Sequence, residues 1–119
     1  MTSLITVLSS GKGTWGHVAQ VIAKQNWDKI FLITNEFGKE NFKVKEKPVE
    51  YIVIDSNKFL SQLVKDIQTQ IKGKIADTEV ALNFISGTGK EHMAVLSALL
   101  KLGLGIRLVT LTPKGVEEF

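Results

Sequence analysis

Two glycine-rich turns hold the residues of this chain that are best suited to chemistry. The first turn spans residues 9–14 and follows the apolar run 4–8, and the second spans residues 86–90 and follows the apolar run 80–85. A glycine turn that leads into a helix directs backbone N–H groups and the positive end of the helix dipole at one point. Such a point binds anions, most often phosphate. The sequence therefore predicts two phosphate sites within 119 residues.

The candidate ligand-binding residues are the members of both turns, because hydroxyls, backbone donors and lysines suit a phosphodiester. The second turn does not have the spacing of an ATP-binding P-loop, and Glu91 stands where that motif needs a magnesium-binding hydroxyl. ATP hydrolysis is therefore not expected. The candidates are Ser9, Ser10, Gly11, Lys12, Gly13 and Thr14 in the first turn, and Ser86, Gly87, Thr88, Gly89 and Lys90 in the second.

The first turn also allows a second interpretation. Gly11, Gly13 and Gly16 match G-x-G-x-x-G, and Glu36 follows about 20 residues later, where a dinucleotide-binding fold places its ribose-binding acid. This pattern indicates a dinucleotide-binding domain of the NAD class, although three glycines can also serve only a turn. The chain has no room for a separate substrate domain, and the NAD class does not require a second glycine turn. A third alternative is an interaction module that binds no nucleotide.

The elements that position the turns alternate between strand and helix. Apolar runs without polar alternation predict strands that are covered on both faces, and 3.6-residue periodicity predicts the helices. The pattern favours an α/β fold: a Rossmann-like three-layer sandwich with a mainly parallel, five- to six-stranded sheet, in a single domain over residues 1–119. We expect strands at 4–8, 29–34, 49–54, 80–85 and 106–111, helices at 14–25, 58–72 and 90–102, and a loop at 35–47.

Local signals mark the ends of these elements. The helix at 58–72 follows three good N-cap candidates, Asp55, Ser56 and Asn57. Gly73 and Gly103 each follow a predicted helix and predict its C-terminal stop.

Composition limits the possible functions. The chain has no cysteine, which excludes a disulfide framework and a thiol nucleophile and suits a cytoplasmic protein. The net charge of +3 suits an anionic ligand but is too small to favour duplex nucleic acid. We see no signal peptide, no membrane span and no cluster of residues with metal-ligand spacing, so we expect no membrane partner and no metal site.

Residues 83–93, which read N-F-I-S-G-T-G-K-E-H-M, resemble the signature of CRISPR-associated Rossmann-fold (CARF) domains. In that family an Asn or Asp near a strand end precedes a small-residue turn with a lysine, and an apolar helix with a methionine follows. The first turn is similar to the family's other motif, a Ser/Gly-rich turn after the first strand. The resemblance covers both turns and the order of the elements.

The resemblance implies a specific ligand and assembly. CARF domains form homodimers that bind a cyclic oligoadenylate, the second messenger of type III CRISPR signalling, and cyclic tetra-adenylate is the expected ring. Some members also cleave the ring by attack of a ribose 2′-OH, without metal or cofactor. Lys90 and the hydroxyls of Ser10 and Thr88 match the family positions for that role, and Lys12 could share it. Whether this chain cleaves the ring or only binds it stays open.

Several further residues allow two interpretations. Asn35 follows the second strand and contacts a base or ribose, or only forms a turn. His17 and His92 are a general base or adenine-stacking residues, or surface residues of a first helical turn, and Trp15 stacks on adenine or packs in the core or a dimer interface. The helix at 90–102 is apolar almost all round, which predicts a dimer contact. The lysine-rich segment forms a solvated loop or a basic flap, with Lys39, Lys43, Lys45 and Lys47 as its members.

Overall fold

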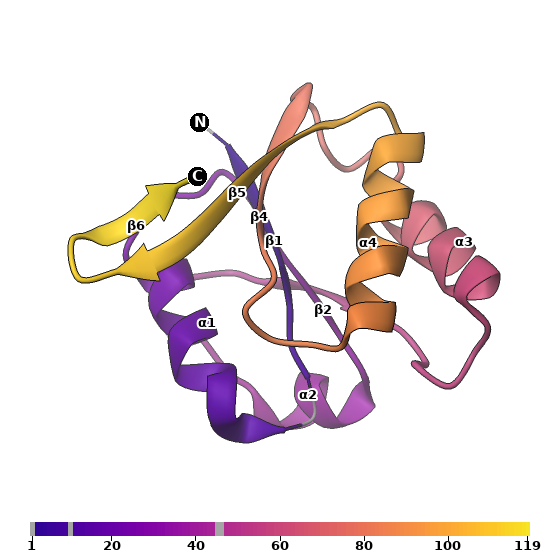
Figure 1. Cartoon of the computed structure of the whole chain (residues 1–119), viewed down its shortest axis with the longest axis horizontal. Coiled ribbons are helices and arrows are strands. Elements are labelled where there is room, and N and C mark those ends of the chain that lie inside the picture. Colours follow the sequence, from indigo (N-terminus) through magenta and orange to yellow (C-terminus); the bar gives the residue numbers. More distant parts are fainter. Residues whose placement is uncertain (1, 10, 45–46) are drawn as a thin grey trace.

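A six-stranded sheet in the order β3-β2-β1-β4-β5-β6 forms the centre of the molecule (Figure 1). The computed structural model describes residues 2–9, 11–44 and 47–119. The first five strands run parallel, and β6 pairs antiparallel with β5. The strands are β1 (Ser3–Val7), β2 (Ile30–Thr34), β3 (Glu50–Val53), β4 (Glu79–Asn83), β5 (Gly105–Thr112) and β6 (Gly115–Glu118).

Helices cover both faces of this sheet, with α1 on one side and the packed pair α3 and α4 on the other (Figure 1). This arrangement confirms the expected Rossmann-like three-layer sandwich with its mainly parallel sheet. The helices are the 3-10 helix η1 (Lys12–Thr14), α1 (Trp15–Ala23), α2 (Glu36–Asn41), α3 (Leu60–Ile71) and α4 (Gly89–Lys101).

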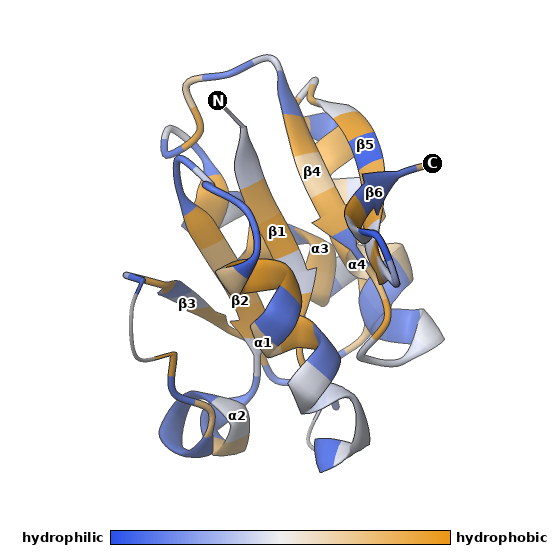
Figure 2. Cartoon of the chain, turned by 90° about the vertical axis from the view of Figure 1, so that its left-hand side faces the viewer, coloured by the Kyte–Doolittle hydropathy of each residue, from blue (hydrophilic) through white to orange (hydrophobic). Residues whose placement is uncertain are grey.

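The central strands separate two hydrophobic cores. Every residue of β1 is buried, and its side chains alternate between the faces. Leu4 packs in the cluster that contains Val18 of α1, whereas Ile5 packs in the cluster that contains Leu63 and Val95 of α3 and α4. The apolar colouring of β1, β2 and β4 in Figure 2 reflects this burial on both sides. Each fully buried aliphatic side chain contributes about 1.5–3 kcal/mol, so the core fixes the register of the central strands.

The expected loop at 35–47 is wrong in part, because the structure contains the short helix α2 there. Asn35 caps this helix by accepting a hydrogen bond from the Gly38 N–H at 2.9 Å. Gly38 is buried against β2, where an added Cβ would lie 1.9 Å from the Thr34 hydroxyl oxygen. Only glycine lets α2 approach the strand this closely, so Gly38 allows the helix to pack on the sheet.

Two further boundaries differ from expectation. The strand β6 was not expected. A turn with Gly115 at φ +110° leads into it, because a residue with positive φ lets the chain reverse after Pro113.

The N-cap of α3 is Phe59, without a side-chain cap, rather than a residue of 55–57. The Asp55 carboxylate instead accepts from the Asn57 N–H at 3.0 Å, which forms a turn before the helix. Gly73 and Gly103 follow α3 and α4 with φ of +79° and +78°, which confirms both stops.

Within the described residues, no helix is long and apolar enough to cross a membrane.

Candidate functional site

The two glycine turns lie next to each other at one edge of the sheet. The first follows β1 and the second follows β4, and these strands are direct neighbours in the sheet. The chain crosses to β2 and β3 on one side of β1 and to β5 on the other side of β4, so the strand order reverses between them. Open α/β sheets bind ligands outside the carboxyl ends of the strands at this reversal. The topology therefore brings both predicted phosphate turns to the position where the fold binds ligands.

A serine pair joins the two turns. The Ser9 N–H donates to the Ser86 hydroxyl oxygen at 2.9 Å, and the Ser86 hydroxyl lies 3.3 Å from that of Ser9. Ser86 is 1% exposed, so its side chain is committed to this bridge rather than presented to solvent. Of the predicted ligand residues, Ser86 thus positions the two turns relative to each other.

The helices that follow the first turn have no side-chain cap at their N-termini. Neither η1 nor α1 has a side-chain cap, and neither has an acidic residue in its first turn. The first N–H groups of a helix have no intrahelical partner, and they carry the positive end of its dipole. Gly11, Lys12 and Gly13 are exposed beside them. The Trp15 N–H at the start of α1 already donates to the Lys12 carbonyl, so an anion here would contact the N–H groups of the turn before it.

Trp15 holds the first turn in place. Its indole N–H donates to the Ser9 carbonyl at 2.9 Å, and its ring meets Phe42 edge-on at 5.5 Å between centroids. Packing against the core, one of the two interpretations of this residue, is what the structure shows. The Lys12 ammonium lies 5.6 Å from the Trp15 ring and 5.7 Å from the Phe37 ring, so it is kept near the turn by cation–π contacts.

The second turn depends on Gly87. Its φ of +102° is rarely adopted by residues with side chains, and an added Cβ would lie 2.6 Å from the Val7 side chain. The His92 ring Nε2 lies 2.7 Å from the Ser86 carbonyl oxygen, to which it donates, and the ring stacks on Phe84 at 4.4 Å. His92 thus braces the turn from α4 through a contact on the protein itself.

Glu91 closes the start of α4 with a capping box. The Thr88 hydroxyl accepts from the Glu91 N–H at 3.2 Å, and the Glu91 carboxylate accepts from the Thr88 N–H at 2.8 Å. Its other oxygen accepts a 2.5 Å hydrogen bond from the Ser56 hydroxyl. Sequence reasoning missed this role, although Thr-x-x-Glu before an apolar run is the signal for a capping box. The Thr88 hydroxyl still has its own proton to donate to a ligand.

Lys90 is exposed, and it contacts the loop after β3. Its ammonium donates to the Ser56 carbonyl at 2.9 Å. Together with the Ser56–Glu91 hydrogen bond, this contact ties the β3–α3 loop to the second turn. The other residue expected to act in catalysis, Ser10, lies outside the described residues.

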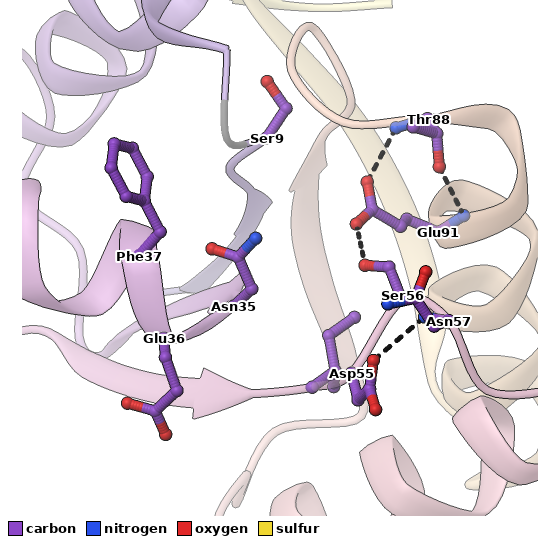
Figure 3. A pocket seen from close by; sticks show the side chains of 10 residues that line it. Ser9, Asn35, Glu36, Phe37, Asp55, Ser56, Asn57, Thr88 and Glu91 are labelled. Carbon is purple, nitrogen blue, oxygen red and sulfur yellow. Dashed lines mark hydrogen bonds between the residues drawn. The ribbon is translucent and has the colours of Figure 1, made fainter.

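Next to the turns lies a cleft of about 620 Å³ (Figure 3). It extends from Ser9 toward the carboxyl ends of β2 and β3, and Asn35 lies on its wall, where sequence reasoning placed a base or ribose contact. Sequence reasoning also placed Thr88 at a ligand, but it did not assign Asp55, Ser56 or Asn57 to a binding site. The described lining residues are Ser9, Asn35, Glu36, Phe37, Ile54, Asp55, Ser56, Asn57, Thr88 and Glu91.

The glycines of the dinucleotide pattern are not required by the geometry. Gly13 and Gly16 have open space where a Cβ would lie, and Gly11 has a φ of −76° and only an ordinary contact. In a dinucleotide-binding fold the third glycine permits close packing of helix on strand. Gly16 has no such contact, and the Glu36 side chain points away from Ser9 (Figure 3). The geometry therefore gives the NAD-class alternative little support.

The remaining candidates lie away from the turns. His17 faces the Thr110 hydroxyl at 3.5 Å, and partial burial lowers the pKa of its imidazole below the usual value. Lys47 caps the C-terminal end of α1, where its ammonium donates to the carbonyls of Ile22, Ala23 and Gln25. Lys45 lies outside the described residues. No group of three or more His, Asp or Glu within the described ranges is arranged to hold a metal ion.

The outer face of α4 is apolar and exposed. Met93, Leu96 and Leu100 follow helical spacing and are 60%, 38% and 60% exposed. With Ser97 and Lys101 they line a shallow depression of about 380 Å³. This face begins one turn after Lys90, so a partner bound there would lie close to the second turn.

Comparison with known proteins identifies the fold only. No protein-family model matches the chain, and no curated protein matches it. Among solved structures, the chain is similar to protein VC1899 from Vibrio cholerae, with a TM-score of 0.57 and 15% identity over 98% of this chain. The chain spans 35% of the length of that protein. At this identity the likeness establishes a shared fold and supports the Rossmann-like assignment.

Proposed function

We propose that this domain binds a cyclic oligoadenylate, with cyclic tetra-adenylate as the expected ring, across a homodimer. One observation carries the proposal: two glycine turns, each at the start of a helix, are joined by the Ser9–Ser86 bridge at the point where the strand order reverses. A single phosphate needs only one such turn. Two turns held at a fixed separation suit a ligand with several phosphodiesters, and the resemblance to CARF domains supports the same ligand.

Charge supports an anionic ligand at the turns. Lys12 and Lys90 are exposed, one beside each turn, and the first turn adds uncapped N–H groups. Among the described residues, the Lys90 ammonium donates to one carbonyl, that of Ser56, which it can exchange for a phosphate oxygen. The overall charge of +3 favours the approach of the ligand.

A second copy of the chain completes the site in this proposal. The exposed apolar face of α4 gives the surface for the contact, and it lies directly after the second turn. Two turns from each subunit give four phosphate positions around a twofold axis. A ring of four adenylates has four phosphates and can have the same symmetry.

The same site suits cleavage of the bound ring. A ribose 2′-oxygen attacks the adjacent phosphorus, the bond from phosphorus to the 5′-oxygen breaks, and the 2′-proton passes to that oxygen. The products are a 2′,3′-cyclic phosphate and a free 5′-hydroxyl. The protein must hold the ring for in-line attack and stabilise the charge that develops on phosphate. Lys90, Lys12 and the Thr88 hydroxyl are the described groups that suit this role, and Ser10 is assigned to it by resemblance.

The test is incubation of the purified protein with cyclic tetra-adenylate in the presence of EDTA, with thermal melting and product analysis. A ligand-dependent rise in Tm supports binding, and cyclic-phosphate products add cleavage. Lys90→Gln should lower the affinity, and product formation with it, whereas the control Lys65→Gln, at an exposed position of α3, should not. If neither cyclic tetra-adenylate nor cyclic hexa-adenylate changes the Tm, the proposal is wrong. NAD serves as the comparison ligand.

A further inference from the structure

The loop between β3 and α3, residues 55–58, forms part of the cleft wall next to the second glycine turn (Figure 3). Hydrogen bonds fix the chain on both sides of this loop. The Ile54 N–H donates to the Thr34 carbonyl at 2.8 Å before it, and the Phe59 carbonyl accepts from the Leu63 N–H at 3.0 Å after it. The segment that can move independently of the sheet and α3 therefore lies between these two bonds.

Residues 55–58 form a turn that is stiffened by hydrogen bonds within it. The Asp55 carboxylate accepts from the Asn57 N–H at 3.0 Å, and the Asp55 carbonyl accepts from the Lys58 N–H at 3.1 Å. Asp55, Asn57 and Lys58 are exposed, so burial of their side chains does little to hold the turn against the protein. The turn should therefore move as one unit when its contacts with other elements are lost.

Ser56 makes the contacts that join this turn to α4. Its hydroxyl donates to the Glu91 carboxylate at 2.5 Å, as Figure 3 shows, and its carbonyl accepts from the Lys90 ammonium at 2.9 Å. Within the described part of the chain, no other hydrogen bond joins residues 55–58 to an element other than α3. One residue thus holds the loop on the first turn of α4 through two bonds.

The two partners of Ser56 differ in their freedom to change contacts. Glu91 is 7% exposed, and its carboxylate also accepts from the Thr88 N–H at 2.8 Å, so the capping box keeps it in place. Lys90 is exposed and has a flexible side chain within the second glycine turn. A phosphate oxygen is charged and the Ser56 carbonyl is not, so a phosphate is the stronger partner for the ammonium. The loop and a phosphate at the turn therefore compete for Lys90.

We propose that these two hydrogen bonds, the Ser56 latch, hold the β3–α3 loop on α4 in the ligand-free protein, and that a phosphate bound at the second turn loosens the loop by taking the Lys90 ammonium. The loop then keeps only the Ser56–Glu91 bond, and one wall of the cleft is freed as the ligand binds. The proposal rests on the proposed function for the phosphate ligand, and it adds a regulation of that site. Because coupling is reciprocal, loosening the loop must strengthen phosphate binding by the same factor.

The first experiment measures the mobility of the loop. The chain has no cysteine, so Asn57→Cys takes a single nitroxide label, and it keeps the backbone N–H that donates to Asp55. Electron paramagnetic resonance spectra are recorded with inorganic phosphate, with cyclic tetra-adenylate, and with chloride at equal ionic strength. We expect phosphate ligands to increase the mobile component of the spectrum and chloride to leave it unchanged. An unchanged spectrum with both phosphate ligands overturns the proposal.

The matched variant for this measurement is Lys90→Met, which removes the ammonium and keeps a long side chain. In the labelled protein it should make the loop mobile without ligand and abolish the further response to phosphate. Lys65→Met, at an exposed position of α3, makes the same charge change and should behave like the parent protein. If the loop stays restrained in Lys90→Met, the contact between Lys90 and Ser56 does not hold it, and the proposal is wrong.

Ser56→Ala tests the reciprocal effect by titration calorimetry. The variant removes the hydroxyl that donates to Glu91, so the loop should loosen and cyclic tetra-adenylate should bind about three- to ten-fold more tightly, which is the effect of one typical hydrogen bond. If the hydroxyl instead contacts the ligand, the same variant binds more weakly, so the direction of the change distinguishes the two roles. Ser61→Ala, at an exposed position of α3, should keep the affinity of the wild type. Equal or weaker binding by Ser56→Ala overturns the proposal.

Failure of the Ser56 latch and failure of the proposed function give different results. If cyclic tetra-adenylate raises the Tm of the wild type but changes neither the label spectrum nor the relative affinity of Ser56→Ala, the latch is wrong and the function stands. If the ring does not bind whereas inorganic phosphate mobilises the label, the latch stands and the ligand of the proposed function is wrong. The affinity of Ser56→Ala is then compared with inorganic phosphate as the ligand.

Discussion

The backbone N–H of Ser9 donates a 2.9 Å hydrogen bond to the side-chain oxygen of Ser86, 77 positions later in the chain. The bond runs from the residue after β1 to the turn after β4, and it links the two glycine turns. It also uses the side chain of a residue that, from the sequence, looked like a direct ligand contact. A single buried hydroxyl therefore joins the two turns beyond the end of the β1–β4 pairing.

Ser86→Ala should lower the stability and the affinity for the ring together. The Ser9 N–H loses its acceptor in a partly buried place, which costs about 1–3 kcal/mol in the free energy of unfolding. Urea denaturation measures this loss, and thermal melts with cyclic tetra-adenylate measure the affinity. Ser61→Ala, at an exposed position of α3, is the control, and it should be neutral or slightly stabilising because alanine favours helix. Equal stability of the two variants would show that the bridge does not hold the turns.

Gly87→Ala and Gly13→Ala should have opposite effects, although both replace a glycine in one of the two glycine turns. Gly87 has a φ of +102° and its Cβ would overlap the Val7 side chain, so the variant should lose about 1–3 kcal/mol or more. Gly13 has no positive φ and open space around a Cβ, so alanine should be tolerated or add up to about 1 kcal/mol. The urea midpoints of the two variants measure the contrast. A loss at position 13 as large as at position 87 would contradict the geometry.

The sheet could be predicted from the sequence, whereas the different roles of Gly87 and Gly13 could not. Strand and helix periodicity was enough for the sheet and for the meeting of both turns at one edge, because the carboxyl ends of parallel strands share an edge. Sequence spacing could not distinguish Gly87, which the backbone requires, from Gly13, which it does not. That distinction depends on φ and on Val7, a residue distant in sequence.

Sequence reasoning identified only some of the residues that line the cleft, because the others are brought there by contacts between distant parts of the chain. Asn35 was a candidate because it follows a strand. Asp55 and Ser56 looked like helix caps, since such residues before a helix usually are. In the structure they form a turn and a wall instead, because α3 begins later, after Phe59. The hydrogen bond between Ser56 and Glu91 joins residues that are 35 positions apart, so no local sequence pattern indicates it.

The exposed face of α4 should mediate self-association. Leu100→Lys places a charge within the apolar face of α4, so we expect a shift from dimer to monomer in light scattering, with little change in Tm because Leu100 is 60% exposed. Phe59→Lys, at another exposed apolar position, should leave the oligomeric state unchanged. If the wild type is already a monomer at high concentration, the dimer in the proposed function is wrong. If Leu100→Lys stays dimeric, the contact lies elsewhere.

His17 should make stability depend on pH near neutrality. Burial lowers the pKa of its imidazole in the folded state, so below the unfolded pKa of about 6.5 the unfolded chain binds more protons than the folded one. The free energy of unfolding therefore increases as the pH rises through the window just below about 6.5.

His17→Gln removes this titration while keeping a polar side chain near Thr110. Urea midpoints between about pH 5 and about pH 7.5 should fall toward low pH more steeply in the wild type than in the variant. Asp66, whose pKa is lowered by hydrogen bonds from Gln62 and Lys58, loses its contribution only at more acidic pH. Parallel curves for the two proteins would show that His17 does not carry the effect.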